Sequence, residues 1–322
     1  MTDLDSPTPG TNANRSYDST DVVAVEDAVA ETVDRLGLVD PAPAGLGLEF
    51  VVHRAVSPTH GPVAIRVPRY QVYRFPGRKP FSATRSLRQE WLVCAYLHPR
   101  RFPVAEPLDL VRTAAGPVLV SRFLPGEPEG VDSGQVGELL ARLHATPVPP
   151  GLVPVDHDGY PVAEATARRL SRRWAQLRAY LPDLPAEPSV ERATAALAPV
   201  GRSAALLHLD MRACNLLTAR GQITGWVDWT CAMVGHPGME LARLSEYAQL
   251  PENGLDERAV LAGYRHQAPL PVLEPALDAL VRLDTVLMLG VIFFSYAPDP
   301  TRQEWARGRI EELTARSREL LA

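Results

Sequence analysis

The sequence predicts an α+β protein in which strands come first and helices dominate the rest. Four short runs rich in apolar and β-branched residues are typical of strands, and they lie at residues 48–56, 63–67, 108–113 and 117–123. Beyond residue 124, apolar residues recur mainly at helical spacing. A length of 322 residues with 46% apolar content allows one large domain or two moderate ones.

The beginning of the chain combines a polar tail with a helix. Residues 1–20 are rich in Ser, Thr, Asn, Pro and Asp, and we expect them to be disordered because they have little apolar surface to bury. Val25, Val29 and Val33 then form one face of an amphipathic helix over residues 22–38. This helix is expected to pack on the strands that follow.

Two glycines, Gly45 and Gly47, stand just before the first strand. A loop that covers a phosphate would lie at this place. Two glycines alone indicate a simple turn equally well, so both interpretations stay open.

The strand at residues 63–67 carries a single arginine, Arg66, between branched apolar residues. Successive side chains of a strand point to opposite faces, so Arg66 lies on the face opposite to these neighbours. A strong helical pattern follows at residues 84–97, and Glu90 lies in its middle, where it is the natural partner of Arg66. A solvated strand arginine and an acid on an exposed helix face are the alternatives.

The rest of the chain is predicted to be mainly helical. Helical patterns lie at residues 133–144, 163–180, 190–197, 238–250, 257–266, 272–297 (expected to be broken) and 302–321. The helix at 163–180 is expected to carry its many arginines on its outer face, and His144 to cap or bridge helices. Glu246, Glu252 and Asp256 could bind a cationic substrate or could be ordinary surface charge.

Three polar residues stand out in the stretch 206–242, namely Asp210, Asn215 and Asp228. The turn residues 219–222 lie between two short strand-like runs, which predicts a hairpin with Asn215 and Asp228 as neighbours across the pair. Their oxygens are the ligands that Mg²⁺ prefers, beside phosphates. Asp210 can lie above such a metal and accept a proton from an incoming hydroxyl. Local turn chemistry is the alternative explanation for these residue types.

This spacing resembles the catalytic loop and metal-binding aspartate of the protein-kinase-like superfamily. The segments His208-Leu-Asp210 and Val227-Asp228-Trp229 are most similar to its aminoglycoside phosphotransferase and choline kinase branch. His236 and Glu240 depart from that branch, which usually has aspartate at both positions. The resemblance implies a bilobal kinase-like fold, with a small β-rich N-lobe over residues 21–123 that binds nucleotide and a larger, mainly helical C-lobe over 124–322 that binds the acceptor and carries the catalytic residues.

The resemblance also implies an activity, the Mg²⁺-dependent transfer of the γ-phosphoryl group of ATP or GTP to a hydroxyl of an antibiotic or related metabolite. Asp210 would be the catalytic residue, and Asn215 and Asp228 would hold Mg²⁺. Arg66, set by Glu90, would contact the α- and β-phosphates, a position where this branch tolerates arginine.

The resemblance further implies backbone contacts to adenine near Ser121 and Phe123, where the small lobe leads into the large one.

A catalytically silent nucleotide-binding protein is the main alternative to the enzyme, because Arg66 replaces lysine and the two glycines are a weak signal for a phosphate-covering loop. A phosphate-ester hydrolase is a remoter one.

Composition narrows the remaining possibilities. A net charge of −5 gives no electrostatic reason to expect nucleic-acid binding. Three cysteines without close pairing argue against a disulfide framework and fit a reducing cytoplasm. No signal peptide is visible, and the longest apolar run, near 286–294, is too short to span a membrane. The oligomeric state stays open.

Overall fold

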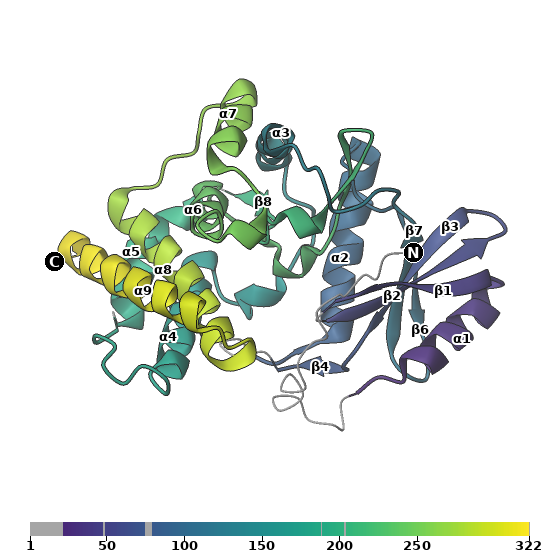
Figure 1. Ribbon diagram of the computed structural model, residues 1–322, viewed down its shortest axis with the longest axis horizontal. Helices are drawn as coiled ribbons and strands as arrows, with labels where there is room; N and C mark the ends of the chain where they lie inside the picture. The colour runs from purple at the N-terminus through teal and green to yellow at the C-terminus, as the bar shows by residue number, and fades with distance from the viewer. Residues whose placement is uncertain (1–21, 48, 75–78, 188, 203, 322) are drawn as a thin grey trace.

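The computed structural model describes residues 22–47, 49–74, 79–187, 189–202 and 204–321. A sheet-rich half and a helical half lie side by side, as Figure 1 shows. This arrangement confirms the predicted α+β fold with a small β-rich lobe and a larger helical lobe. The expected disordered tail at 1–20 lies outside the described residues, and a lobe boundary between residues 123 and 124 stays a prediction.

The small lobe is built on an antiparallel sheet with the strand order β1-β2-β3-β7-β6. Its strands are β1 (Val39–Leu46), β2 (Phe50–Ser57), β3 (Gly61–Pro68), β6 (Pro107–Arg112) and β7 (Pro117–Arg122), and a short ribbon pairs β4 (Val72–Tyr73) with β5 (Phe81–Ser82). The sequence did not predict β1. Its two prolines are tolerated because it is an edge strand, and every one of its residues is exposed.

Two helices cover the two faces of this sheet. The apolar residues of β3, among them Val63, Ile65 and Val67, are fully buried in a cluster that includes residues of α1 (Val25–Leu36). The helix α2 (Ala83–Leu97) lies between the sheet and the helical half (Figure 1). The predicted alternation along β3 is therefore confirmed, and the face that carries Arg66 points toward α2.

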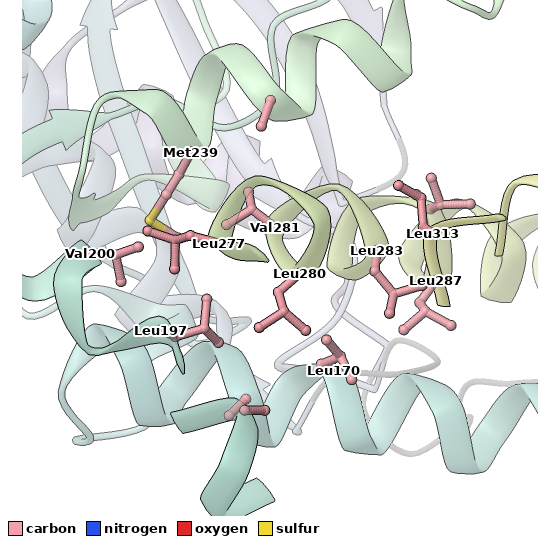
Figure 2. Close-up of a cluster of buried hydrophobic side chains, with 14 of the residues drawn as sticks. Leu170, Leu197, Val200, Met239, Leu277, Leu280, Val281, Leu283, Leu287 and Leu313 are labelled. Carbon is pink, nitrogen blue, oxygen red and sulfur yellow. The ribbon is translucent and has the colours of Figure 1, made fainter. Parts of the chain in front are cut away.

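The large lobe contains the predicted helices with small shifts at their ends. They are α3 (Ser133–Ala145), α4 (Val162–Leu177), α5 (Val190–Leu197), α6 (Gly238–Tyr247), α7 (Glu257–Gln267), α8 (Pro275–Val291) and α9 (Pro300–Leu321). The expected break after the apolar run is present, because α8 passes into a π-helical turn at Ile292–Tyr296. Leucines of α4, α5, α8 and α9 form the main core, as Figure 2 shows.

The arginines of α4 correct one expectation. Arg169 and Arg173 are 2% exposed and both pair with the carboxylate of Asp284 on α8, at 2.8 and 2.6 Å. They therefore face the core rather than solvent. The sequence pattern could not indicate that these arginines are buried, because their partner Asp284 lies more than a hundred residues away in the chain.

Side-chain hydrogen bonds join the two lobes at α2. Gln89 donates from Nε2 to the carbonyls of Trp229 and Thr230 at 2.7 and 3.0 Å, and its Oε1 accepts from the Val155 N–H at 2.7 Å. Gln89 is 4% exposed. None of the helices in the described ranges is long and apolar enough to cross a membrane.

Candidate active site

The predicted hairpin is present and positions two of the three key polar residues. It pairs β9 (Leu216–Ala219) with β10 (Gln222–Trp226) through a turn at Arg220 and Gly221, whose positive φ angles of 53° and 74° suit a tight hairpin. Asn215 directly precedes β9. The Val227 N–H donates to the Asn215 carbonyl at 3.0 Å, so Asp228 follows immediately after this cross-strand contact.

The loop that precedes the hairpin is supported by Glu240 of α6. Its carboxylate accepts hydrogen bonds from the N–H groups of His208 and Leu209 at 3.0 and 2.6 Å, and it pairs with His144 at 3.1 Å. Leu209 has a φ of +58°, a strained conformation for a leucine that this carboxylate holds in place. Glu240, one of the two departures from the family pattern, thus supplies the local bonds itself, and His144 bridges helices as expected.

His236, the other departure, has a local structural contact. Its Nδ1 accepts from the Gly238 N–H at 3.0 Å at the start of α6. This contact satisfies a backbone N–H in the first turn of the helix that carries Glu240.

His208 shapes the loop rather than reaching a substrate. The ring is fully buried and packs against both Trp226 and Trp229, with centroid distances of 5.0 and 4.6 Å. Its Nδ1 accepts from the Asp210 N–H at 3.1 Å and its Nε2 lies 3.0 Å from the Val227 carbonyl, which fits a neutral ring that donates from Nε2. Burial lowers the pKa of His208, in agreement with that neutral form.

Asp210 lies at the end of this loop and is 8% exposed. Its Oδ1 accepts from Arg212 Nε at 3.0 Å and from the Tyr247 hydroxyl at 3.2 Å, and its Oδ2 accepts from Arg212 Nη2 and Asn215 Nδ2, at 2.7 and 2.8 Å. Burial alone would raise the pKa of Asp210, but the charge and hydrogen bonds of Arg212 outweigh it and lower the pKa to about 2. The carboxylate is therefore ionised and held from several sides.

Asn215 and Asp228 carry the oxygens that could hold a metal. The Asn215 amide donates from Nδ2 to the Asp210 carbonyl and carboxylate, both at 2.8 Å, which leaves its Oδ1 as a possible ligand. The Asp228 side chain is 36% exposed, and its residue has a φ of +66° at the bend after β10. Among the described residues, no group of three or more His, Cys, Asp or Glu side chains could hold a metal.

Arg66 and Glu90 meet as predicted. Arg66 Nη1 lies 3.3 Å from Glu90 Oε1, and its Nη2 lies 3.5 Å from Asp228 Oδ1. The guanidinium also stacks over the Phe50 ring, with its Cζ 4.1 Å from the ring centroid. Burial raises the pKa of Glu90, and Arg66 opposes that rise. The arginine, rather than being solvated, links the α2 carboxylate to the metal-binding candidate Asp228.

The adenine-contacting residues stay a prediction. Ser121 lies on β7 opposite Ala64 of β3, next to the strand that carries Arg66. The Phe123 N–H donates to the Pro62 carbonyl at 3.1 Å, so an adenine contact from Phe123 would have to use its carbonyl. Gly45 pairs within β1 and β2, and the Gly47 N–H donates to the Phe50 carbonyl at 2.8 Å, so the two glycines end β1 at the turn toward β2.

The three acids proposed for a cationic substrate all have internal partners. Glu246 is fully buried between arginines of α8 and α9, at 2.9 and 2.7 Å, and is neither a surface charge nor a substrate contact. Glu252 pairs with an arginine of α9 at 2.9 Å. Asp256 caps α7 by accepting a backbone N–H at 3.1 Å.

Two residues around Asp210, namely Arg212 and Tyr247, were not singled out in the sequence. Arg212 stands two residues after Asp210, and this short spacing was the available signal. Tyr247 is 37 residues away in the sequence, and its approach depends on how α6 packs under the loop.

Comparison with known proteins now adds to this geometry. The model of the phosphotransferase enzyme family matches residues 52–276, which include every candidate site residue. The chain belongs to this family. It is accordingly a kinase-type O-phosphotransferase, as the sequence predicted. A comparison with curated protein sequences gives no significant match.

Solved structures of other phosphotransferases share the fold. The aminoglycoside phosphotransferase APH(4)-Ia superposes with a TM-score of 0.60 at 13% identity, over 91% of this phosphotransferase and 99% of that chain. A macrolide 2'-phosphotransferase type I gives a TM-score of 0.53 at 17% identity, over 90% of this chain and 98% of that one. A thermostable APH(4)-Ia variant, solved in a ternary complex with ADP and hygromycin B, gives 0.55 at 14% identity over 89% and 97%. At these identities the likeness shows the fold.

Proposed function

We propose that this phosphotransferase moves the γ-phosphoryl group of ATP, or of GTP, to a hydroxyl of a small molecule with the help of Mg²⁺. The observation that carries the proposal is that one hairpin holds two linked pairs of side chains. Asp210 bonds to Asn215, and Asp228 pairs with Arg66. The Val227 N–H, one residue before Asp228, donates to the Asn215 carbonyl and so joins the two pairs through the backbone. Phosphoryl transfer requires positioning and charge neutralisation above all, and these pairs offer both.

Arg66 is the residue that would bind the α- and β-phosphates. Its planar fork can donate two hydrogen bonds to phosphate oxygens, and Glu90 and the Phe50 ring restrict its orientation in advance. Asp228 neutralises it in the structure described. A nucleotide phosphate would replace Asp228 as the partner of Arg66. The Asp228 carboxylate would then be available to the metal.

The residues present fit a magnesium site of the usual composition. Asn215 Oδ1 and the half-exposed Asp228 carboxylate are two hard oxygen ligands, which together with phosphate oxygens and water make the shell that Mg²⁺ prefers. Such an ion would supply positive charge that neutralises the triphosphate oxygens. The Asn215 amide would stay hydrogen-bonded to Asp210 from Nδ2 while its Oδ1 served as the ligand.

Asp210 would orient the acceptor hydroxyl and receive its proton. The acceptor oxygen bonds to the γ-phosphorus while the bond from that phosphorus to the β-bridging oxygen breaks, and the hydroxyl proton passes to Asp210. Both carboxylate oxygens of Asp210 already accept two side-chain hydrogen bonds in the structure described. Because the Arg212 side chain is 38% exposed, it is the partner that an acceptor hydroxyl can displace, and its charge can then turn to the triphosphate.

The acceptor is a hydroxylated small molecule. The structural relatives include enzymes named for aminoglycosides and macrolides, and one was solved with hygromycin B, which supports an antibiotic or a similar metabolite. Glu246 and Glu252 pair with arginines and Asp256 caps α7, which favours an acceptor with few positive charges over a polycation. The reducing cytoplasm stays our expectation for its location.

The central test replaces the proposed base. Asp210→Ala should bind MgATP nearly as the unchanged protein does, yet lose at least about a thousandfold in kcat, because removal of a key group from a preorganised site typically has effects of this order. Turnover is read as ADP release and as the mass of the phosphorylated product, over a panel that includes hygromycin B, kanamycin and erythromycin.

Asp183→Ala provides the matched control, because Asp183 is exposed. It should leave both readouts unchanged. An Asp210→Ala protein that releases ADP at the unchanged rate contradicts the proposal. Nucleotide binding without any ADP release by the unchanged protein would favour a catalytically silent nucleotide-binding protein.

A further inference from the structure

The last turn of α6 holds a pair of residues directly beneath the candidate base. Tyr247 ends the helix, and Arg243 lies one turn before it. Both are buried, with exposures of 2% and 6%. Arg243 contacts the Tyr247 oxygen twice, from Nε at 3.1 Å and from Nη2 at 2.8 Å.

The direction of these hydrogen bonds follows from the chemistry of the two groups. A guanidinium has N–H donors and no acceptor, so the Tyr247 oxygen must accept from Arg243. The phenol proton is then free to point elsewhere, and Asp210 Oδ1 lies 3.2 Å away. The chain of bonds therefore runs in one direction, from Arg243 through the Tyr247 hydroxyl to the carboxylate of Asp210. Burial raises the pKa of Tyr247 well above its usual range, so the hydroxyl keeps its proton.

The surroundings of Tyr247 and Arg243 exclude water and restrict the motion of both side chains. Tyr247 belongs to a buried apolar cluster with Leu250, Leu289 and Phe293. Arg243 Nη2 also lies 3.0 Å from the sulfur of Met288 on α8. Hydrogen bonds in such a low-dielectric setting orient their partners more strongly than they would in water.

The contacts of Asp210 divide into an open side and a buried side. Arg212, with 38% of its side chain exposed, lies on the open side, where an acceptor must enter. Tyr247 and Asn215 bond to different carboxylate oxygens from the buried side. When an acceptor displaces Arg212, these two contacts are the ones that still fix the plane of the carboxylate.

We propose that Tyr247, oriented by Arg243, is a positioning residue that holds the carboxylate of Asp210 in the plane needed to receive the acceptor proton. This role rests on the proposed function of Asp210. Tyr247 touches no reacting atom itself. Its hydrogen bond to Oδ1 restricts rotation of the Asp210 carboxylate, so that the acceptor hydroxyl meets the carboxylate in one orientation.

The test removes only the hydroxyl, by Tyr247→Phe. Steady-state ADP release from MgATP is measured with water as the acceptor, so that no acceptor need be known. We expect kcat to fall about five- to twentyfold, as for the loss of one orienting hydrogen bond. The KM for MgATP and the affinity for MgAMP-PNP should not change, because Tyr247 contacts no nucleotide-binding candidate.

Thr314→Val is the matched control. It also deletes a buried hydroxyl, one that bonds to a carbonyl within α9, far from the catalytic loop in sequence. A purely structural role for Tyr247 predicts similar losses of thermal stability in both variants and no selective change in kcat. Equal kcat values for Tyr247→Phe and the unchanged protein would overturn the inference while leaving the proposed function intact.

A double-mutant cycle then tests the part of Arg243. Arg243→Lys keeps the charge but removes the two-pronged contact, so it should lower kcat about three- to tenfold in the unchanged background and have no further effect in Tyr247→Phe. Additive losses would mean that Arg243 does not act through Tyr247. A protein that binds MgAMP-PNP but releases no ADP, with water or with any acceptor of the panel, would overturn the proposed function together with this role.

Discussion

At the scale of single residues, the guanidinium of Arg66 is the clearest departure from the lysine expected on this strand. It contacts Glu90, Asp228 and the face of Phe50 together, which a single ammonium could not do. Arginine at this position therefore changes both the group that carries the positive charge and the contacts that hold it.

Arg66→Met should weaken the binding of MgAMP-PNP about ten- to a hundredfold, because charge-assisted hydrogen bonds to phosphate would be lost. Isothermal titration measures the effect. Arg88→Met, a change on the same helix as Glu90 at an exposed position, is the control and should bind normally. Unchanged affinity of Arg66→Met would show that Arg66 is a structural ion-pair residue.

The sequence indicated the candidate site residues better than the residues that surround them. Asp210, Asn215 and Asp228 were found from their types and spacing, and Arg66 and Glu90 meet as predicted. Tyr247 could not be found in this way, because its contact depends on a helix placed 37 residues later in the chain. A polar residue is assigned from sequence when its spacing is local, and is missed when tertiary packing decides its partner.

At the scale of the elements, the crossing of α3 and α7 depends on two glycines. A Cβ on Gly137 would lie 1.9 Å from the Val260 carbonyl oxygen, and one on Gly263 would lie 2.0 Å from the Gly134 carbonyl oxygen. The two helices therefore touch backbone to backbone. No helical pattern in the sequence indicates so close an approach, although glycine within a helix is a sign that a packing reason exists.

Gly137→Ala should destabilise the fold by about 1–3 kcal/mol or more, because the added methyl forces the helices apart. Urea unfolding followed by circular dichroism measures the change. Gly308→Ala on α9 is the control, since its Cβ would meet nothing within 4 Å, and alanine is the better helix former there. Equal stabilities for the two variants would contradict the close crossing.

The strand β1 shows where element prediction fails. Its sequence Val-Asp-Pro-Ala-Pro-Ala-Gly-Leu has neither alternation nor β-branched residues beyond the first, so nothing local indicates a strand. Pairing with β2 creates it, and its edge position makes the prolines acceptable. The helices, whose apolar spacing is local, were predicted to within a few residues.

At the scale of the whole molecule, stability should depend on pH through His157. It lies in the short 3-10 helix Val155–His157 near α4, and its Nε2 has no hydrogen-bond partner among the described residues. Burial, reinforced by the charge of Arg169, lowers the pKa of His157 to about 4. The folded protein therefore keeps this ring neutral under mildly acidic conditions.

The unfolded chain binds a proton at His157 near its usual pKa of 6.5, whereas the folded chain does so only near about 4. The free energy of unfolding should accordingly fall as the pH drops from about 6.5 to about 4. His157→Gln should flatten this slope in urea unfolding measured at several pH values, and His60→Gln, at an exposed position, should not. Parallel slopes for all three proteins would contradict a neutral, partly buried ring.

The hydrogen bonds of Gln89 set a limit on how this enzyme can be inhibited. They join the helix that bears Glu90 to Trp229, Thr230 and Val155, so a compound that separates the two lobes at α2 must break three buried hydrogen bonds at once. Inhibitors that require an outward movement of this helix would therefore be opposed by these bonds. Compounds that compete with the triphosphate for its proposed site, or that bind on the side of Asp210 where Arg212 lies, are the more accessible strategy.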